Sequence, residues 1–256
     1  MKKILSLFSL TPENVGDMAC SWGNQYESFN VVKSKNPYDS IISSNQNVTF
    51  GHINDFREDY NDFDLVVIGG GCIINSSHEN GIWRAINSSK NCTIRSVGVK
   101  DWDLANKLRD RLKNNFTIRH TVEGFVYESC PSLVEVEKYK VTQGINRNIE
   151  KTKELLFACH QNYKEEIEIL QNKGFDVIVN DCNIDHAFEK ISKAKKVVTS
   201  SYHFLLWADA FGCEVELFSK DENTDQNKLP IDSDMRKFIN IPIKYNLIDI
   251  QKYIKY

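Results

Sequence analysis

The chain has 256 residues, of which 41% are hydrophobic and 26% charged, as is usual for a globular protein. A formal net charge of −3 provides no general attraction for nucleic acid, so we expect no nucleic-acid partner. No segment reaches the roughly 18 apolar residues that a membrane span needs. The apolar run after Lys2 and Lys3 is short and contains serines, which favours a first buried strand over a secretion signal.

The seven cysteines are widely spaced, and several lie inside apolar runs. This odd number and these positions predict reduced, buried thiols and a cytoplasmic protein. The sequence has no Cys-x-x-Cys pair and no His-x-x-x-His pair, so we expect no metal site.

Short apolar runs alternate with amphipathic segments along the chain. Most of the runs lack a strict apolar–polar alternation, which indicates strands that are covered on both faces. The predicted strands are 3–8, 64–68, 93–99, 155–159, 176–179, 196–200 and 214–218, and the predicted helices are 101–114, 163–173, 185–195 and 203–211. For the helix 185–195 we expect an acidic N-cap. Strands that alternate with helices predict parallel βαβ units.

The domain organisation follows from this alternation. The segment 155–218 is regular enough to form a Rossmann-like half by itself, and the polar segment 137–153 fits a linker. We therefore predict an α/β protein with two Rossmann-like lobes and parallel sheets, comprising residues 1–140 and 150–256. The second lobe ends in a predicted helical segment formed by 235–239 and 246–254.

The first candidate motif is Asn14-Val15-Gly16-Asp17, which follows the first strand. A glycine between polar residues at a strand-to-helix turn can expose peptide N–H groups that hold an anion. The alternative is a turn with a purely structural role, in which Asp17 caps the next helix.

Three consecutive glycines, Gly69, Gly70 and Gly71, follow the strand 64–68. Such glycines allow the backbone to approach a ligand closely, or a helix to pack closely on the sheet. The surrounding residues match neither the dinucleotide-binding nor the Walker pattern, so a nicotinamide or ATP site is not indicated. The glycines mark the ligand side of the sheet and no more.

Arg119 lies in the stretch Phe116-Thr117-Ile118-Arg119-His120, at the end of a short strand. Its guanidinium group suits an anion clamp, because its fork of donors matches phosphate or carboxylate. An ordinary surface ion pair is the alternative.

Two hydroxyls, a phenol and an imidazole stand at the junction of strand 196–200 and helix 203–211, as Ser200, Ser201, Tyr202 and His203. The helix dipole favours a neutral imidazole at His203, whereas a bound phosphate would favour the protonated form and suit a general acid. The alternative is a histidine that only caps a buried helix. His160 ends another strand of the same lobe and could face the same cleft.

Taken in order, these motifs resemble those of the polysaccharide pyruvyl transferase family. The resemblance is carried by Asn14–Asp17, by 64–74 with its glycines, by Arg119 before Pro131-Ser132-Leu133, and by 200–212. It implies a fold like that of the B-type glycosyltransferases, with the active site in the cleft between the lobes. It also implies transfer of a pyruvyl group from phosphoenolpyruvate, the donor substrate, to two hydroxyls of a sugar or polysaccharide acceptor, with no further cofactor.

The resemblance also implies roles for particular residues. His203 would be the acid or base at the donor, and Asp17 would bind or activate the acceptor. Arg119 would clamp an anionic group of the donor. Neutral contacts to the substrates would come from Asn14, Gly16, Gly70, Gly71, His160, Ser200, Ser201 and Tyr202.

Two residues depart from the family pattern. Ser201 stands where one branch of the family has an arginine, so His160 or Lys100 would have to replace that cation. Phe204 stands where a glycine is common, and would narrow the space beside the imidazole. A glycosyltransferase that uses a nucleotide sugar, and an inactive member that binds glycan or phosphate, therefore stay open as alternatives.

Overall fold

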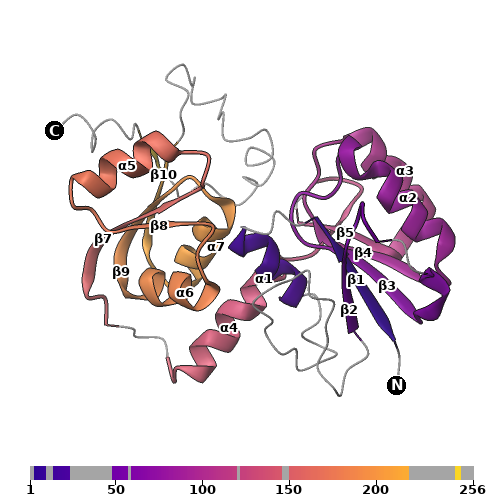
Figure 1. Ribbon diagram of the computed structural model, residues 1–256, viewed down its shortest axis with the longest axis horizontal. Coiled ribbons are helices and arrows are strands. Elements are labelled where there is room, and N and C mark those ends of the chain that lie inside the picture. The colour runs from indigo at the N-terminus through magenta and orange to yellow at the C-terminus, as the bar shows by residue number, and fades with distance from the viewer. Residues whose placement is uncertain are drawn as a thin grey trace. The chain divides into compact units, whose positions relative to one another are not determined.

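The computed structural model describes residues 3–9, 14–23, 48–56, 59–119, 122–145, 150–218 and 246–248. The chain divides into two compact units. Unit 1 comprises Met1–Pro12 and Asp17–Ser132, and unit 2 comprises Glu13–Gly16 and Leu133–Tyr256. Each unit contains one parallel sheet with helices packed on it (Figure 1). The prediction of an α/β protein with two Rossmann-like lobes is confirmed.

Unit 1 contains a six-stranded sheet in the order β2-β1-β3-β4-β5-β6. Its strands are β1 (Ile4–Phe8), β2 (Val48–His52), β3 (Leu65–Gly69), β4 (Cys92–Val97), β5 (Phe116–Ile118) and β6 (Val126–Tyr127), and its helices are α1 (Val15–Gly23), α2 (Glu79–Ser88) and α3 (Trp102–Leu112). The first two residues of α1 belong to unit 2. Because β2 and β3 lie on opposite sides of β1, the chain reverses direction across the sheet there. Ligands of such sheets bind at the carboxyl ends of the strands on either side of this reversal.

The central strand of unit 1, β1, forms because its apolar run is buried completely. All five residues of β1 are buried, as expected for a central strand covered on both faces. Helix α3 begins where the Asp101 carboxylate accepts a hydrogen bond of 2.9 Å from the Leu104 N–H, and it buries Leu104 and Leu108 against the sheet. Each such leucine contributes roughly 1.5–3 kcal/mol by leaving water. Helices α2 and α3 lie on the same face of the sheet (Figure 1).

Unit 2 has a five-stranded sheet in the order β11-β10-β9-β7-β8. Its strands are β7 (Lys153–Cys159), β8 (Val177–Val179), β9 (Ala194–Thr199), β10 (Glu214–Phe218) and β11 (Asn246–Ile248), and its helices are α4 (Ser132–Thr142), α5 (Lys164–Asn172), α6 (Ile184–Lys193) and α7 (Tyr202–Ala210). The chain again reverses direction, here between β7 and β9, so the carboxyl ends of these two strands are the expected ligand side.

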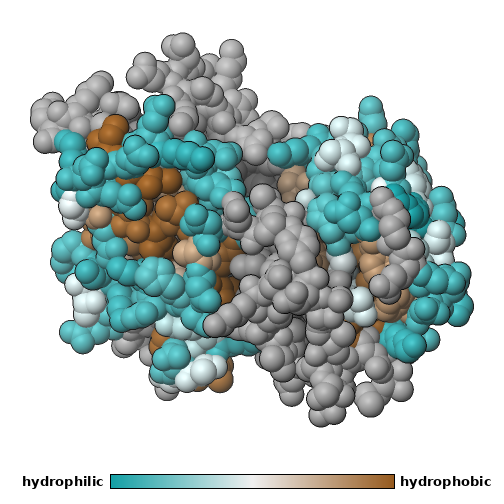
Figure 2. All heavy atoms as spheres, in the orientation of Figure 1, coloured by the Kyte–Doolittle hydropathy of each residue, from teal (hydrophilic) through white to brown (hydrophobic). Residues whose placement is uncertain are grey.

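Aromatic and aliphatic side chains fix the helices of unit 2. Ile167 and Leu170 of α5 pack with Phe157 of β7 on one face of the sheet. Phe188 of α6 and Trp207 of α7 lie 4.9 Å apart in an edge-to-face contact, the preferred geometry of an aromatic pair. In Figure 2, hydrophobic residues gather where β7 and β8 lie in Figure 1, framed by hydrophilic ones.

Several local predictions were wrong. Residues Asn246–Ile248 form a strand that pairs with β10, not a helix, because tertiary strand pairing overrides the local pattern. The predicted segment 235–239 lies outside the described residues. The polar segment from Glu137 begins inside α4, and the side chain of Asn183, not an acidic one, caps α6. None of the described helices is long and apolar enough to cross a bilayer.

Candidate functional site

The carboxyl edge of the unit 2 sheet brings His160 and Ser200 together. They directly follow β7 and β9, the strands on either side of the reversal. The Ser200 hydroxyl accepts a hydrogen bond of 3.0 Å from the His160 N–H. The ring Nδ1 of His160 in turn accepts from the Asn162 N–H at 3.3 Å. Backbone and side chains therefore hold both predicted residues at the edge where ligands of parallel sheets bind.

Helix α7 begins at this same edge. Thr199 fixes the turn, because its hydroxyl donates to the Ala158 carbonyl at 2.6 Å and accepts from the Ser201 N–H at 3.0 Å. Ser201 is the N-cap of α7 and is buried, but its side chain makes no capping hydrogen bond. The start of α7 places peptide N–H groups at the carboxyl edge of this sheet. Such groups are suited to anions.

The His203 side chain packs against Gly16, and both residues belong to unit 2. The imidazole is 6% exposed, and its ring centre lies 5.2 Å from that of Tyr202. A Cβ atom at position 16 would lie 2.0 Å from the Nδ1 of His203, far closer than nonbonded atoms approach. Any side chain larger than that of glycine at position 16 would therefore displace the His203 ring from its observed position. Phe204, expected to narrow the space beside the imidazole, is fully buried and packs on Trp207, so it belongs to the core.

The peptide N–H groups near Gly16 have other partners than the predicted anion. The Gly16 N–H donates to the Asn14 side-chain oxygen at 3.0 Å, and the Val15 N–H donates to the Asn180 carbonyl at 2.7 Å. The Gly16 N–H, which the sequence analysis assigned to the substrate, is thus used here in a local turn that Asn14 closes. Asp17 lies inside the first turn of α1 and is not its cap.

Asn180 is a residue that the sequence analysis missed. It follows β8, is 1% exposed, and its side-chain oxygen accepts from the Gln161 N–H at 2.8 Å. It thus joins the loop after β7 to the turn at Val15. Within the described part of the chain its Nδ2 has no hydrogen-bond acceptor. A buried donor without an acceptor costs about 1–3 kcal/mol, which favours a water or ligand atom there. An asparagine directly after a short apolar strand was the available signal.

In unit 1, Asp17 and the glycines after β3 are close together. Gly70 and Gly71 have φ angles of 85° and 59°, the left-handed region that glycine adopts without strain. A Cβ at Gly71 would lie 2.8 Å from the Oδ1 of Asp17. The glycines therefore bring the loop against the Asp17 carboxylate, at the carboxyl ends of β1 and β3.

Arg119 is buried at the carboxyl end of β5, with an exposed fraction of 6%. A Cβ atom at Gly98 would lie 2.8 Å from the Nη2 of Arg119 and 3.0 Å from the Sγ of Cys72. Gly98 follows β4, the neighbouring strand, so the guanidinium group lies over the strand ends. This burial excludes the surface ion pair considered for Arg119, since buried arginine is rare and needs compensation.

None of the seven cysteines forms a disulfide, and four of them, Cys20, Cys92, Cys130 and Cys159, are buried. In unit 1 the Sγ atoms of Cys20 and Cys130 lie 3.5 Å apart, and Cys130 contacts the Ser132 hydroxyl at 3.2 Å. Burial raises the pKa of Cys20 well above its usual value, and Cys130 raises it further, against a smaller lowering by the charge of Arg119. Cys20 is therefore a protonated, weakly nucleophilic thiol.

No known protein family matches the sequence, and no curated protein matches it. A solved structure of a functionally uncharacterized protein from Klebsiella pneumoniae subsp. pneumoniae is similar, with a TM-score of 0.52, 13% identity, and coverage of 96% of this chain and 93% of that one. At this identity the likeness shows the fold alone. A periplasmic metal binding protein from Candidatus Liberibacter asiaticus gives a TM-score of 0.20 at 12% identity, covering 87% of this chain and 92% of that one, which is too low to carry an argument.

Proposed function

We propose that this protein is a transferase that moves a pyruvyl group from phosphoenolpyruvate to a sugar of a surface glycan or its precursor. The observation that carries the proposal is the position of the His203 imidazole. His203 lies in the first turn of α7, at the carboxyl edge of the unit 2 sheet, and its ring packs against Gly16. A titratable ring beside a helix N-terminus combines a proton carrier with donors for an anionic substrate. The resemblance of the sequence motifs to those of the pyruvyl transferases is the reason for proposing phosphoenolpyruvate as that anionic substrate.

The reaction needs one proton donor and one proton acceptor. One sugar hydroxyl adds to C2 of phosphoenolpyruvate while the methylene carbon C3 takes a proton and becomes a methyl group. A second hydroxyl then displaces phosphate from C2, which closes the ketal. In the proposal His203 supplies the proton to C3 or removes one from an attacking hydroxyl. Its burial keeps bulk water away from the transfer.

The anionic groups of the donor need hydrogen-bond donors. In unit 2 the proposal assigns these to the hydroxyls of Ser200 and Ser201 and to the buried Nδ2 of Asn180. Such donors stabilise charge without having to reorganise. In unit 1 the proposal keeps Arg119 as an anion clamp and Asp17 as the group that binds or activates the acceptor. The cytoplasmic location and the site in a cleft between the lobes stay predictions.

A thermal-shift panel with phosphoenolpyruvate, UDP, CMP and buffer tests the donor. A ligand at one hundred times its dissociation constant adds about 2.7 kcal/mol of stability. We expect stabilisation by phosphoenolpyruvate and loss of that effect in His203→Ala. His186→Ala, on the exposed side of α6, is the matched control and keeps the effect. Stabilisation by UDP alone supports the nucleotide-sugar glycosyltransferase instead, and no response to any ligand refutes the proposal.

Phosphate release tests the chemistry. We expect the protein to release phosphate from phosphoenolpyruvate when glycan oligosaccharides that carry neighbouring free hydroxyls are added, and the product to gain a ketal-linked pyruvyl group in its mass. His203→Ala should reduce the rate by about 100-fold or more, as removal of an acid–base group does. Full phosphate release by His203→Ala would show that its assigned role is wrong.

A further inference from the structure

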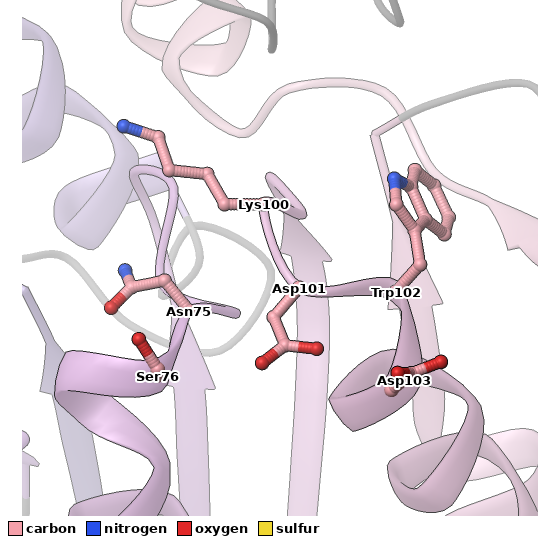
Figure 3. Close-up of a pocket in the computed structure, with 6 residues that line it drawn as sticks. All are labelled: Asn75, Ser76, Lys100, Asp101, Trp102 and Asp103. Atoms are coloured by element: carbon pink, nitrogen blue, oxygen red, sulfur yellow. The ribbon is translucent and has the colours of Figure 1, made fainter.

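Unit 1 contains an open pocket of about 450 Å³ between the loops that follow β3 and β4. It is lined by Asn75, Ser76, Lys100, Asp101, Trp102 and Asp103 (Figure 3). In Figure 3 the Asp101 carboxylate lies between Asn75 and Ser76 of one loop and Trp102 and Asp103 of the other, while Lys100 extends above Asn75. The pocket thus lies at the carboxyl edge of the sheet, where ligands of this fold class bind.

The backbone holds the two walls of the pocket together. Ile74 and Val99 form a parallel β-bridge beyond the ends of β3 and β4. The N–H groups of Lys100 and Asp101 both donate to the Ile74 carbonyl, at 2.8 and 3.1 Å. The Asn75 side-chain N–H donates to the Cys72 carbonyl at 2.8 Å. The bonds of Ile74 join the two loops and the Asn75 bond folds the first loop on itself, so the pocket is preformed, as binding sites usually are.

The charges of the pocket disfavour an anionic ligand. Two carboxylates, Asp101 and Asp103, stand against the single ammonium group of Lys100. The helix starts on both walls are also capped, because Asp101 accepts from the Leu104 N–H at 2.9 Å and Asn75 from the Ser77 N–H at 3.0 Å. A phosphate would find these N–H groups already used and a carboxylate beside it. The ligand that fits carries neutral groups that both donate and accept hydrogen bonds.

Trp102 supplies an apolar platform among these polar groups. Its indole is half-buried and makes an edge-to-face contact with Phe125, with ring centres 5.6 Å apart. A ring held in this way gives contact area at a small entropic cost. A sugar ring matches the combination, because it presents C–H groups on its faces and hydroxyls around its rim. Carboxylate, hydroxyl and ammonium groups all pair with sugar hydroxyls, whereas the Asn75 amide is engaged with Cys72 and Ser77 and shapes the wall.

We infer that this pocket is a carbohydrate-binding subsite that takes one neutral pyranose ring. If the proposed function holds, this ring belongs to the acceptor glycan, and that assignment rests on the proposed function. Binding of the sugar itself does not. A single ring in an open pocket should bind with a dissociation constant on the order of 1 mM, worth about 4 kcal/mol.

Saturation-transfer NMR on the full-length protein, without phosphoenolpyruvate, tests the subsite. The probes are the methyl pyranosides of glucose, galactose, mannose and N-acetylglucosamine, with choline and inorganic phosphate as comparisons. We expect at least one glycoside to bind, and Trp102→Leu to raise its dissociation constant at least tenfold. Asp103→Asn, at an exposed position, is a second variant that leaves the packing of Trp102 alone and should also weaken binding. Lys107→Gln, exposed on the same helix, is the control and should have no effect.

Several results would overturn the inference. They are the absence of saturation transfer to any glycoside up to about 50 mM, binding that neither Trp102→Leu nor Asp103→Asn weakens, and binding of choline or phosphate in place of the sugars. The two proposals fail separately. Sugar binding without phosphate release refutes the transferase and leaves the subsite. Phosphate release with an unchanged acceptor KM in both pocket variants refutes the acceptor assignment and leaves the transferase.

Discussion

Replacing Gly16 by alanine is the sharpest test of how the candidate site is built. The new methyl carbon would lie 2.0 Å from the Nδ1, 2.3 Å from the Cγ and 2.8 Å from the Cβ of His203. Because nonbonded heavy atoms settle at about 3.5–4 Å, the imidazole must move by about 1.5 Å. Overpacking of this kind costs about 1–3 kcal/mol. Elsewhere in a helix, glycine to alanine would stabilise by up to about 1 kcal/mol, so the sign of the effect is diagnostic.

Urea unfolding and phosphate release measure the two consequences. We expect Gly16→Ala to lower the free energy of unfolding, and to reduce phosphate release by about 100-fold, since a displacement of 1 Å can cost that much. The double variant Gly16→Ala/His203→Ala removes the obstructing ring. Relative to the single variant His203→Ala, the double variant should therefore be equally stable or more stable. The double-mutant cycle should give a coupling energy of about 0.5–3 kcal/mol between the two positions. A Gly16→Ala single variant that is more stable than the wild type and fully active would refute this account.

Three further predictions follow from single residues. Asn180→Ala should lose about 1–3 kcal/mol of stability in urea unfolding, because the Gln161 N–H loses a buried acceptor; an unchanged midpoint would contradict this. Partial burial raises the pKa of Asp176, but the hydrogen bond from Lys190 and its charge lower it more, so the net pKa is below the usual value. The stabilisation is present above the unfolded pKa of about 4 and is lost as the pH falls through the folded pKa. Asp176→Asn should thus be less stable than wild type at neutral pH and match it in strong acid, and a constant difference in urea midpoint would refute the linkage. Burial raises the pKa of Cys159 to about 12, so iodoacetamide should label it, as measured by mass spectrometry, only when the protein unfolds; labelling of the native protein would show an accessible thiolate.

The sequence predicted the parts of the fold that local physics determines. Seven predicted strands correspond to β1, β3, β4, β7, β8, β9 and β10, and the short strand before Arg119 corresponds to β5. They were visible because a strand buried on both faces needs a continuous apolar run. The strands β2, β6 and β11 were not predicted. β6 has only two residues, both exposed, and β11 is defined by its pairing with β10. Edge strands of this kind depend on the neighbouring strand and carry little pattern of their own.

The candidate site was predicted in part for the same reason. Ser200 and His203 were found because a strand-to-helix junction is visible in one stretch of sequence. Asn180 was missed because its partners come from two distant segments, the end of β7 at Cys159 and Gln161 and the start of α1 at Val15. The pocket beside Trp102 was missed as well, since it depends on two loops whose pairing, at Ile74 and Val99, forms only in the folded sheet. Local patterns reveal which residues end a strand, whereas the pairing of those ends is a property of the folded sheet.

The glycines show this difference most clearly. In the sequence, Gly16 and Gly71 were interpreted as places where backbone could approach a ligand. In the structure, each of three glycines makes room for one predicted functional side chain of its own unit. The pairs are Gly16 with His203, Gly71 with Asp17, and Gly98 with Arg119. At Gly16 the Cβ would meet the Cγ and Cβ of His203 at 2.3 and 2.8 Å, atoms near the backbone that cannot easily move, so this glycine and its partner must be retained or changed together. At Gly71 and Gly98 the nearest partner atom is the end of a flexible side chain, so we expect weaker coupling. Coupled loss of function at these pairs, in double variants, would therefore separate positioning by the backbone from contact with a ligand.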